Sequence, residues 1–250
     1  MAGDDVLRRR FRAARRDPEL TVLEGFHALK HALRFGAVVE IAVGTDPDEL
    51  EKLAAALAPD LAGRFAALVE TVAPDVLAEL VPLAPRTGVV AIARRKRADL
   101  GAALADRRDA PVVLLEQPRN MGNRGACVRV AAAADAAALL TIGENDPWHP
   151  DALRGAAGLH YALPAVAAVE RAPRAERRPL LALDPAGEEI DPAAIPPRAV
   201  LAFGTERHGL SAELLAAADG RIALPMRDGV SSLNLATSVA AVLYAVRLAR

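Results

Sequence analysis

The sequence has a single cysteine, three lysines and few aromatic residues: one Trp, two Tyr and five Phe among 250 residues. One cysteine, Cys127, excludes an internal disulfide, and nothing points to an oxidising compartment. A membrane span needs about 18 consecutive apolar residues, and no such run is free of both charge and proline. The arginine-rich first residues are not followed by the apolar core of a signal peptide. We therefore expect a cytoplasmic protein.

Charge is nearly balanced, with 31 basic and 32 acidic residues and a formal net charge of -1. Because only Lys30, Lys52 and Lys96 are lysines, 28 of the 31 basic residues are arginines. This excess, with abundant Ala, Pro and Asp, is typical of a GC-rich genome and is not by itself a functional signal. The 52% hydrophobic content excludes global disorder. The neutral balance leaves a nucleic-acid partner open, because the distribution of basic residues decides that question.

The first 97 residues predict a small α/β layer domain with a basic arm. Residues 1–16 read as a short basic amphipathic helix or as a frayed arm. Helices are then predicted at residues 24–35 and 74–80, and strands are predicted at residues 38–43, 67–72 and 88–93. Such alternation indicates helices packed on a sheet.

The charged run at 94–97 and the stretch that follows it to Asp109 interrupt the apolar periodicity, so residues 98–110 are predicted to be a linker or an inter-domain helix. An almost continuous apolar run then begins at Pro111, as a parallel strand buried on both faces requires. Further strands are predicted at residues 138–142, 165–169, 180–183, 200–203 and 222–224, with helices at 122–134 and 233–248. The predicted fold class of residues 111–250 is therefore α/β with a mostly parallel sheet.

Three segments follow predicted strands, where open parallel sheets bind their ligands. The first, residues 117–125, carries Gly122 and Gly125 and leads into a helix with Arg129. The glycines permit close backbone approach, and a helix start offers free N–H groups to an anion. A capped helix with a surface arginine explains the same residues. The G-x-G-x-x-G fingerprint is absent here, which counts against NAD or FAD.

The second segment, residues 201–211, is a glycine-bounded loop with an acid, a base and a histidine. Solvated loop charges are an equally simple interpretation of it. The third segment, residues 222–234, ends in Ser232 and Asn234 at the start of the last helix. Capping explains Asn234, but its pairing with Ser232 makes a site plausible.

Together these segments resemble the ordered motifs of the SpoU/TrmH-type RNA ribose 2'-O-methyltransferases, a family of the SPOUT superfamily. Asn120–Arg129 resembles N-x-G-N-x-G-A-x-x-R, and Leu201–Ser211 resembles L-x-x-G-x-E-x-x-G-L-S. Ile222–Asn234 resembles I-x-(I/L)-P-M-x-x-x-x-x-S-L-N. Between them, Asp146–Gly158 is similar to D-P-(Y/W)-x-P-x-x-x-R-x-x-x-G. The resemblance spans residues 111–250 with the order and spacing of the motifs intact.

The resemblance implies that residues 111–250 form a SPOUT α/β trefoil-knot domain, in which the C-terminal segment passes through a loop. Residues 23–28 and 88–91 are similar to the ribosomal-protein-L30e-like domain that many members carry. This similarity implies an RNA substrate-binding domain over residues 1–97. The family also works as a homodimer whose active site gathers residues from both protomers.

The resemblance further implies that the knot binds S-adenosylmethionine, framed by Gly204, Leu224 and Leu233. The implied catalytic residues are Arg129, Glu206, Ser232 and Asn234, and the implied substrate-binding residues are Asn120, Arg129 and Arg154. Because arginine is a poor base, we assign Arg129 to electrostatic stabilisation of the developing ribose alkoxide. In this interpretation, Ser232 and Asn234 position substrate and cofactor, and Glu206 orients Arg129 or the loop.

Other chemistry-bearing residues have simpler interpretations. His27 and His31 share a helix face with Glu24, but no third strong ligand is evident, so no metal is predicted. Cys127 lies in an apolar helix segment and is expected in the core. The arginines of residues 8–16 and 94–97 are expected either to contact RNA phosphates or to form solvated helix faces.

The sequence thus predicts an S-adenosylmethionine-dependent ribose 2'-O-methyltransferase acting on RNA. Ribosomal RNA is favoured over tRNA, because the extra N-terminal domain is typical of rRNA-acting members. A tRNA 2'-O-methyltransferase, a base-nitrogen methyltransferase and a catalytically silent RNA-binding SPOUT dimer are the alternatives. The intact motif residues count against the silent dimer.

Overall fold

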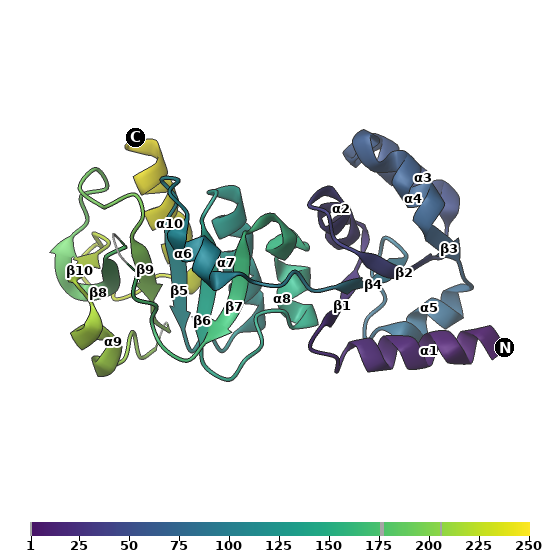
Figure 1. Ribbon diagram of the computed structural model, residues 1–250, viewed down its shortest axis with the longest axis horizontal. Coiled ribbons are helices and arrows are strands. Elements are labelled where there is room, and N and C mark those ends of the chain that lie inside the picture. The colour runs from purple at the N-terminus through teal and green to yellow at the C-terminus, as the bar shows by residue number, and fades with distance from the viewer. Residues whose placement is uncertain (1, 176–177, 206) are drawn as a thin grey trace. The chain divides into compact units, whose positions relative to one another are not determined.

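The computed structural model describes residues 2–175, 178–205 and 207–250, which form two compact units (Figure 1). The first unit runs to Lys96 and includes the distant segment Ala157–Ala162. The second unit comprises Arg97–Ala156 and Leu163–Arg250. Glu206, a predicted catalytic residue, lies outside the described residues. In the described part of the chain, no helix is long and apolar enough to cross a membrane.

The first unit is built on a four-stranded mixed sheet in the order β1-β4-β2-β3. Strand β4 is antiparallel to β1 and β2, whereas β3 is parallel to β2. The strands are β1 (Leu20–Glu24), β2 (Val39–Gly44), β3 (Val69–Thr71) and β4 (Val89–Arg94). The helices are α1 (Ala2–Ala14), α2 (Phe26–Arg34), α3 (Pro47–Leu57), α4 (Ala62–Leu68) and α5 (Pro74–Leu80), with 3₁₀ turns η1 (Pro59–Leu61) and η2 (Leu159–Ala162).

Two predicted boundaries in this unit are wrong. Helix α4 continues to Leu68, so the strand predicted at residues 67–72 is confirmed only for its central part. Helix α2 begins at Phe26, because Glu24 ends strand β1 and Gly25 has a φ of +93°. This positive φ favours glycine and separates strand from helix.

The N-terminal segment is a docked helix and not a frayed arm. Phe11 and Ala14 of α1 are fully buried and belong to a core cluster with Val22, Leu77 and Ile92. Burying one large apolar side chain contributes about 1.5–3 kcal/mol, which exceeds what helix propensity alone supplies to a helix of this length. The core therefore holds α1 in place, and its arginines lie on the outer faces.

The segment 157–162 folds with the first unit although it is remote in sequence. The Tyr161 hydroxyl donates to the Arg94 carbonyl at 2.9 Å, and Nδ1 of His31 lies 2.7 Å from the Ala157 carbonyl oxygen. Gly158 has a φ of +75°, and a Cβ there would lie 2.5 Å from the Ala28 carbonyl oxygen. The glycine at the end of the Asp146–Gly158 motif thus permits backbone contact with α2.

The second unit is built on a six-stranded sheet in the order β10-β8-β9-β5-β6-β7, with all five neighbouring pairs parallel. The predicted α/β class with a mostly parallel sheet is confirmed. The strands are β5 (Val112–Glu116), β6 (Ala138–Ile142), β7 (Ala165–Val169), β8 (Leu180–Glu189), β9 (Val200–Phe203) and β10 (Gly220–Ala223). The helices are α6 (Leu100–Ala105), α7 (Met121–Ala133), α8 (Pro150–Gly155), α9 (Ala212–Ala217) and α10 (Leu235–Leu248).

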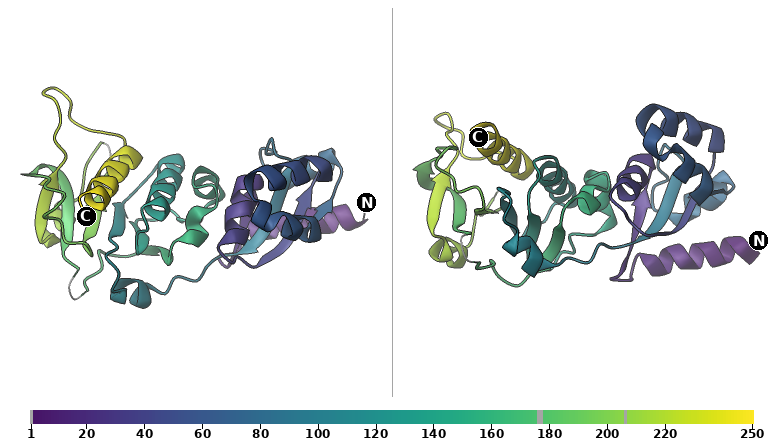
Figure 2. Two further views of the ribbon diagram at one scale, coloured as in Figure 1. Left: turned by 90° about the horizontal axis from the view of Figure 1, so that it is seen from above. Right: turned by 45° about the horizontal axis from the view of Figure 1, so that its top comes forward.

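Helices cover both faces of this sheet. Figure 2 shows α10, α7 and α8 in a row along one face, with α6 on the opposite side. Gly125 of α7 permits the close packing of α8, since a Cβ there would lie 2.3 Å from the Ala152 carbonyl oxygen. The sequence predicts that Gly125 serves approach to a ligand, but its missing side chain leaves room for helix α8. A trefoil knot in this unit stays a prediction.

Strand β8 is longer than predicted and leaves the ladder in its middle. Ala182 pairs with Arg221, but the next pair joins Glu188 to Ile222. Pro185, in the excursion between them, has no N–H for a ladder hydrogen bond. Residues 183–185, in this unpaired part of β8, line the pocket described below at the carboxyl edge of the sheet.

A buried arginine attaches residues 103–110 to the second unit. The Arg178 side chain is 3% exposed and donates to five backbone carbonyls, at distances of 2.8–3.3 Å. The acceptors belong to Ala103, Leu104, Asp106, Ala110 and Arg198. Burial lowers the pKa of Arg178, but these carbonyls stabilise its charge. Residues 98–110, predicted as a linker or an inter-domain helix, thus contain helix α6, and Arg178 holds residues 103–110 to the second unit.

Candidate active site

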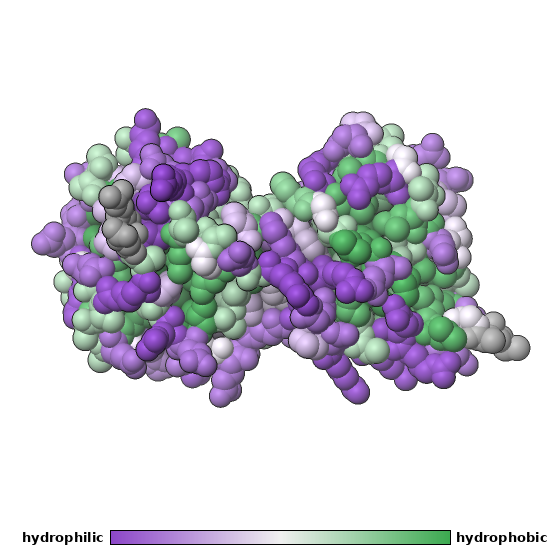
Figure 3. All heavy atoms as spheres, in the orientation of Figure 1, coloured by the Kyte–Doolittle hydropathy of each residue, from purple (hydrophilic) through white to green (hydrophobic). Residues whose placement is uncertain are grey.

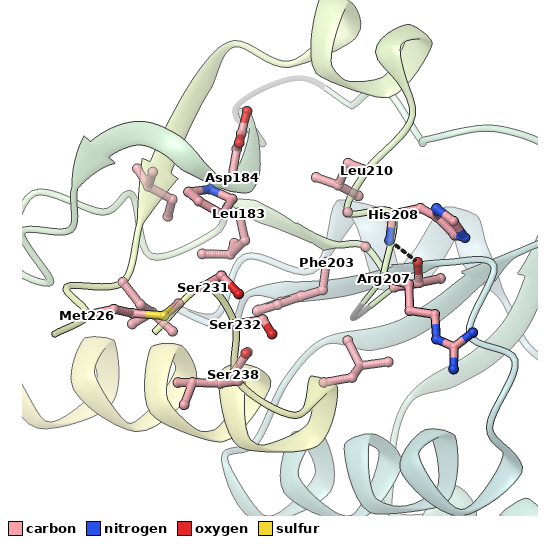
Figure 4. Close-up of a pocket in the computed structure, with 18 of the residues that line it drawn as sticks. Leu183, Asp184, Phe203, Arg207, His208, Leu210, Met226, Ser231, Ser232 and Ser238 are labelled. Carbon is pink, nitrogen blue, oxygen red and sulfur yellow. Dashed lines mark hydrogen bonds between the residues drawn. The ribbon is translucent and has the colours of Figure 1, made fainter. Parts of the chain in front are cut away.

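One pocket of about 440 Å³ gathers the second and third motif segments at the carboxyl edge of the second sheet (Figure 4). Its walls come from the β8 excursion, the loop after β9, the end of β10 and the start of α10. The volume lies within the range of small-molecule sites. Its lining includes Leu183, Asp184, Phe203, Gly204, Thr205, Arg207, His208, Leu210, Leu224, Met226, Ser231, Ser232, Leu233 and Ser238.

The loop after β9 closes on itself beside this pocket. Thr205 and Gly209 exchange two backbone hydrogen bonds, at 3.1 and 2.9 Å, and Oγ1 of Thr205 accepts from the His208 N–H at 3.1 Å. A Cβ on Gly204 would lie 2.0 Å from the Gly209 carbonyl carbon. The sequence predicts that Gly204 serves approach to a cofactor, but its missing side chain also leaves room for the chain itself.

Glu116, which sequence reasoning missed, ties the first and second motif segments together. Its carboxylate accepts from the Ser211 N–H at 2.6 Å and from the Ser211 hydroxyl at 2.7 Å. The same hydroxyl accepts from the Leu214 N–H at 3.2 Å and caps helix α9. The sequence signal that could have indicated this contact is an acidic residue at the end of one strand and a helix-capping serine in the loop after another. Glu116 thereby anchors the loop that forms one wall of the pocket.

Three asparagines join the first and third motif segments. The Asn120 side chain caps α7 by accepting from the Asn123 N–H at 2.9 Å. The Asn234 side chain caps α10 and donates to Oδ1 of Asn123 at 3.1 Å. Because Asn234 is the cap, α10 begins at Leu235 and not at Leu233 as predicted. These contacts hold the starts of two helices side by side.

Arg124, also missed from the sequence, lies completely buried beneath the first motif segment. Its guanidinium donates to the carbonyls of Pro118 and of Asp146, the latter at 2.9 Å. Burial lowers the pKa of this guanidinium, but the carbonyl acceptors favour its charged form. Arg124 therefore connects the loops that follow β5 and β6.

The predicted site residues fall into two groups in the structure. Gly204, Leu224, Ser232 and Leu233 line the pocket together, and Asn234 follows directly after them. Asn120 is joined to Asn234 through Asn123.

Arg129 and Arg154 lie outside the pocket lining. Arg129 is exposed on α7, and its side chain has no partner among the described residues. Arg154, on α8, pairs with Asp151 at 2.6 Å. Glu206, the predicted partner of Arg129, is outside the described residues.

The weaker candidates have structural explanations. Glu24 accepts from Arg15 at 2.7 Å, and burial lowers the pKa of His31, whose Nδ1 faces the Ala157 carbonyl. Within the residues that the structure describes, no group of three His, Cys, Asp or Glu side chains could hold a metal. Cys127 is buried, as predicted.

We expect Glu116→Ala to loosen the loop after β9, because Ser211 loses both acceptor oxygens. The expected result is roughly tenfold faster amide exchange at Leu210 and Ser211, which equals about 1.4 kcal/mol of lost protection. Hydrogen–deuterium exchange with mass spectrometry measures this change. Glu170→Ala, which removes an exposed carboxylate at the end of β7, is the control. Equal exchange in the two variants would contradict the anchoring role.

Comparison with known proteins agrees with this geometry. The sequence model described as the SpoU rRNA Methylase family matches residues 110–244. The 23S rRNA (uridine(2479)-2'-O)-methyltransferase of Streptomyces viridochromogenes is 32% identical over 69% of this chain. The chain spans 64% of the length of that relative.

Solved structures extend the likeness to both units. An AdoMet-bound rRNA methyltransferase from Sinorhizobium meliloti is 25% identical, with a TM-score of 0.75 over 98% of this chain and 94% of that one. An RNA 2'-O ribose methyltransferase is 28% identical, with a TM-score of 0.71 over 97% and 94%. With its motif segments gathered at one edge of a parallel sheet, the chain belongs to the SpoU methylase family.

Proposed function

We propose that this protein transfers a methyl group from S-adenosylmethionine to a ribose 2'-hydroxyl of RNA. The observation that carries the proposal is the pocket in which Gly204, Leu224, Ser232 and Leu233 meet. In a member of the SpoU methylase family, motif residues converging on one small-molecule pocket support transfer chemistry over a silent binding module. The chain's relatives named as rRNA and RNA 2'-O-methyltransferases support the same reaction.

The residues of the pocket fit S-adenosylmethionine. Phe203, Leu224 and Leu233 offer apolar walls for an adenine ring, and Ser231 and Ser232 offer hydroxyls. Asp184 also lines the pocket, and its carboxylate pairs with Arg221 at 3.5 Å. When bound, this cofactor supplies a methyl group on a positively charged sulfur. The apolar walls exclude water and hold the reactants in line.

The chain's own residues then have to activate a weak nucleophile. Arg129 lies about two turns into α7, and its guanidinium has no partner among the described residues. We assign it to stabilise negative charge on the ribose oxygen. Ser232 positions the cofactor from the pocket wall, and Asn234 is held in place by Asn123. The role of Glu206 in orienting Arg129 stays a prediction.

Ribosomal RNA is the favoured substrate. The Streptomyces and Sinorhizobium proteins are both named as rRNA methyltransferases, and the latter's structure covers both units of this chain. Transfer RNA is the alternative, and a base nitrogen is the alternative acceptor. We also propose that the protein acts in the cytoplasm, where RNA of this kind is found.

We expect the wild-type protein to label unmodified ribosomal RNA from tritiated S-adenosylmethionine. Digestion to nucleosides should give a 2'-O-methylated nucleoside, and Arg129→Ala should lower the rate about 100-fold or more because the alkoxide loses its cation. Calorimetry should show unchanged cofactor affinity in that variant, since Arg129 does not line the pocket.

Label in tRNA alone would reject ribosomal RNA as the substrate, and a base-methylated product would reject the 2'-hydroxyl as the acceptor. No cofactor binding by the wild type would favour the silent module.

The arginines of residues 8–16 divide into those with a carboxylate partner and those with none among the described residues. Arg8 pairs with Glu79 at 2.6 Å, Arg10 with Glu40 at 3.0 Å and Arg15 with Glu24 at 2.7 Å.

Three further arginines of this segment, Arg9, Arg12 and Arg16, are exposed and have no partner among the described residues. Arg9 and Arg12 are three residues apart on α1, as on one helix face, and Arg16 follows in the turn after α1. Figure 3 shows hydrophilic residues gathered along α1. We infer that this face contacts RNA phosphates.

Replacing both Arg9 and Arg12 by Ala should weaken RNA binding and lower its salt dependence. Each lost phosphate contact reduces the slope of log affinity against log salt by about 0.7–0.9. The double variant Arg107→Ala/Arg171→Ala removes two exposed arginines from the second unit and is the control. Filter binding at several salt concentrations measures RNA affinity for both double variants. Equal slopes of log affinity against log salt in the two would contradict the assignment.

We also infer that the protein is a homodimer. Tyr244 and Leu248 of α10 are 39% and 82% exposed, and they lie one turn apart on the outer face of the last helix. We infer that these two side chains lie in the contact between the protomers. Sedimentation should give twice the chain mass of 26.2 kDa, and Tyr244→Asp should give the monomer. A wild-type monomer at micromolar concentration would reject this inference.

A further inference from the structure

We propose that a small hollow beside the cofactor pocket holds the phosphodiester on the 3' side of the target nucleotide, through Arg119 and His208. This inference rests on the proposed function and names a further positioning site for the same reaction. Besides these two residues, the hollow is lined by Glu116, Gln117, Thr205, Gly209, Leu210 and Ser211, with a volume of about 120 Å³.

The hollow and the cofactor pocket lie on two sides of one loop. Thr205, His208, Gly209 and Leu210 line both of them. Figure 4 shows the ring of His208 turned away from Ser231 and Ser232, the hydroxyl residues of the cofactor pocket. A group bound in the hollow is therefore separated from the cofactor pocket only by this loop.

Both walls of the hollow are held by hydrogen bonds. Glu116 binds Ser211 through both carboxylate oxygens, and Thr205 and Gly209 exchange backbone hydrogen bonds. The other wall turns at Gln117, whose φ of +45° is unusual for a residue other than glycine. Its N–H donates to the Ile142 carbonyl at 2.7 Å, which keeps the turn in place. Such strained backbone is found at functional sites, where the surrounding structure maintains it.

Three exposed side chains of the hollow can donate hydrogen bonds. Arg119, His208 and Gln117 are exposed and have no side-chain partner among the described residues. The carboxylate of Glu116 is already occupied by Ser211, which weakens its competition for the arginine. The guanidinium of Arg119 matches two oxygens of a phosphate, and His208 adds a further N–H. The site thus favours an anion with several acceptor oxygens.

The hollow is large enough for a single phosphate group but too small for a whole nucleotide. Its volume of about 120 Å³ is well below the range of about 300–1,000 Å³ that holds small molecules. In RNA, the 2'-hydroxyl and the 3'-oxygen sit on neighbouring ribose carbons. A phosphate on the 3' side, once held here, keeps the 2'-hydroxyl beside the cofactor pocket. This arrangement supplies the alignment that the reaction requires.

The test combines Arg119→Ala with a chemical change in the RNA. Once the methylated nucleotide is mapped, a short RNA is made with a neutral methylphosphonate at its 3' phosphate. With ordinary RNA, Arg119→Ala should lower kcat/KM about 10- to 100-fold, the loss expected for one charge-assisted contact, while calorimetry shows unchanged cofactor affinity. The wild type should lose a similar factor on the methylphosphonate RNA. For the Arg119→Ala variant, changing from ordinary RNA to the methylphosphonate RNA should lower kcat/KM little further, because the variant already lacks the contact with this phosphate.

Two controls separate the outcomes. Arg107→Ala removes an exposed arginine that lines neither cavity and should behave as the wild type. Independent, multiplying losses from Arg119→Ala and from the methylphosphonate would overturn the phosphate site, as would normal turnover by Arg119→Ala. A wild type that methylates no RNA at all would instead refute the proposed function, and this inference with it.

Discussion

The hydrogen bonds between the Glu116 carboxylate and Ser211 are the contact on which the site depends. They join the end of β5 to the loop after β9, two segments 95 residues apart in the chain. That loop separates the cofactor pocket from the smaller hollow, so its position sets the shape of both cavities. A carboxylate that accepts both an N–H and an O–H fixes direction as well as distance, which a contact between apolar residues does not.

The arginines show how differently one residue type is used in this protein. Arg124 and Arg178 are buried and donate to backbone carbonyls, which holds the loops and the segment around α6 in place. Others pair with carboxylates of the first unit, as Arg15 does with the buried Glu24. A third group, including Arg119 and Arg129, remains exposed without a described partner. The sequence does not distinguish these groups, because their difference lies in which carbonyls and carboxylates surround each guanidinium.

The glycines of the motifs illustrate a related point. Gly125, Gly158 and Gly204 all stand at motif positions, and the sequence predicts that Gly125 and Gly204 serve approach to a ligand. In the structure, a Cβ at each would collide with the protein's own backbone, at α8, at Ala28 and at Gly209 respectively. Motif spacing therefore reports close chain packing as well as ligand contact, since both need a residue without a side chain.

The sequence alone determined the α/β class, most strands of the parallel sheet and the identity of the motif segments. Strand patterns depend on local burial, so β6, β7 and β9 could be predicted to the residue. Only the tertiary structure decided that residues 157–162 join the first unit, that Glu116 holds Ser211, and that Arg124 is buried. Each of these depends on partners distant in the chain, and local sequence pattern carries no information about which distant groups meet.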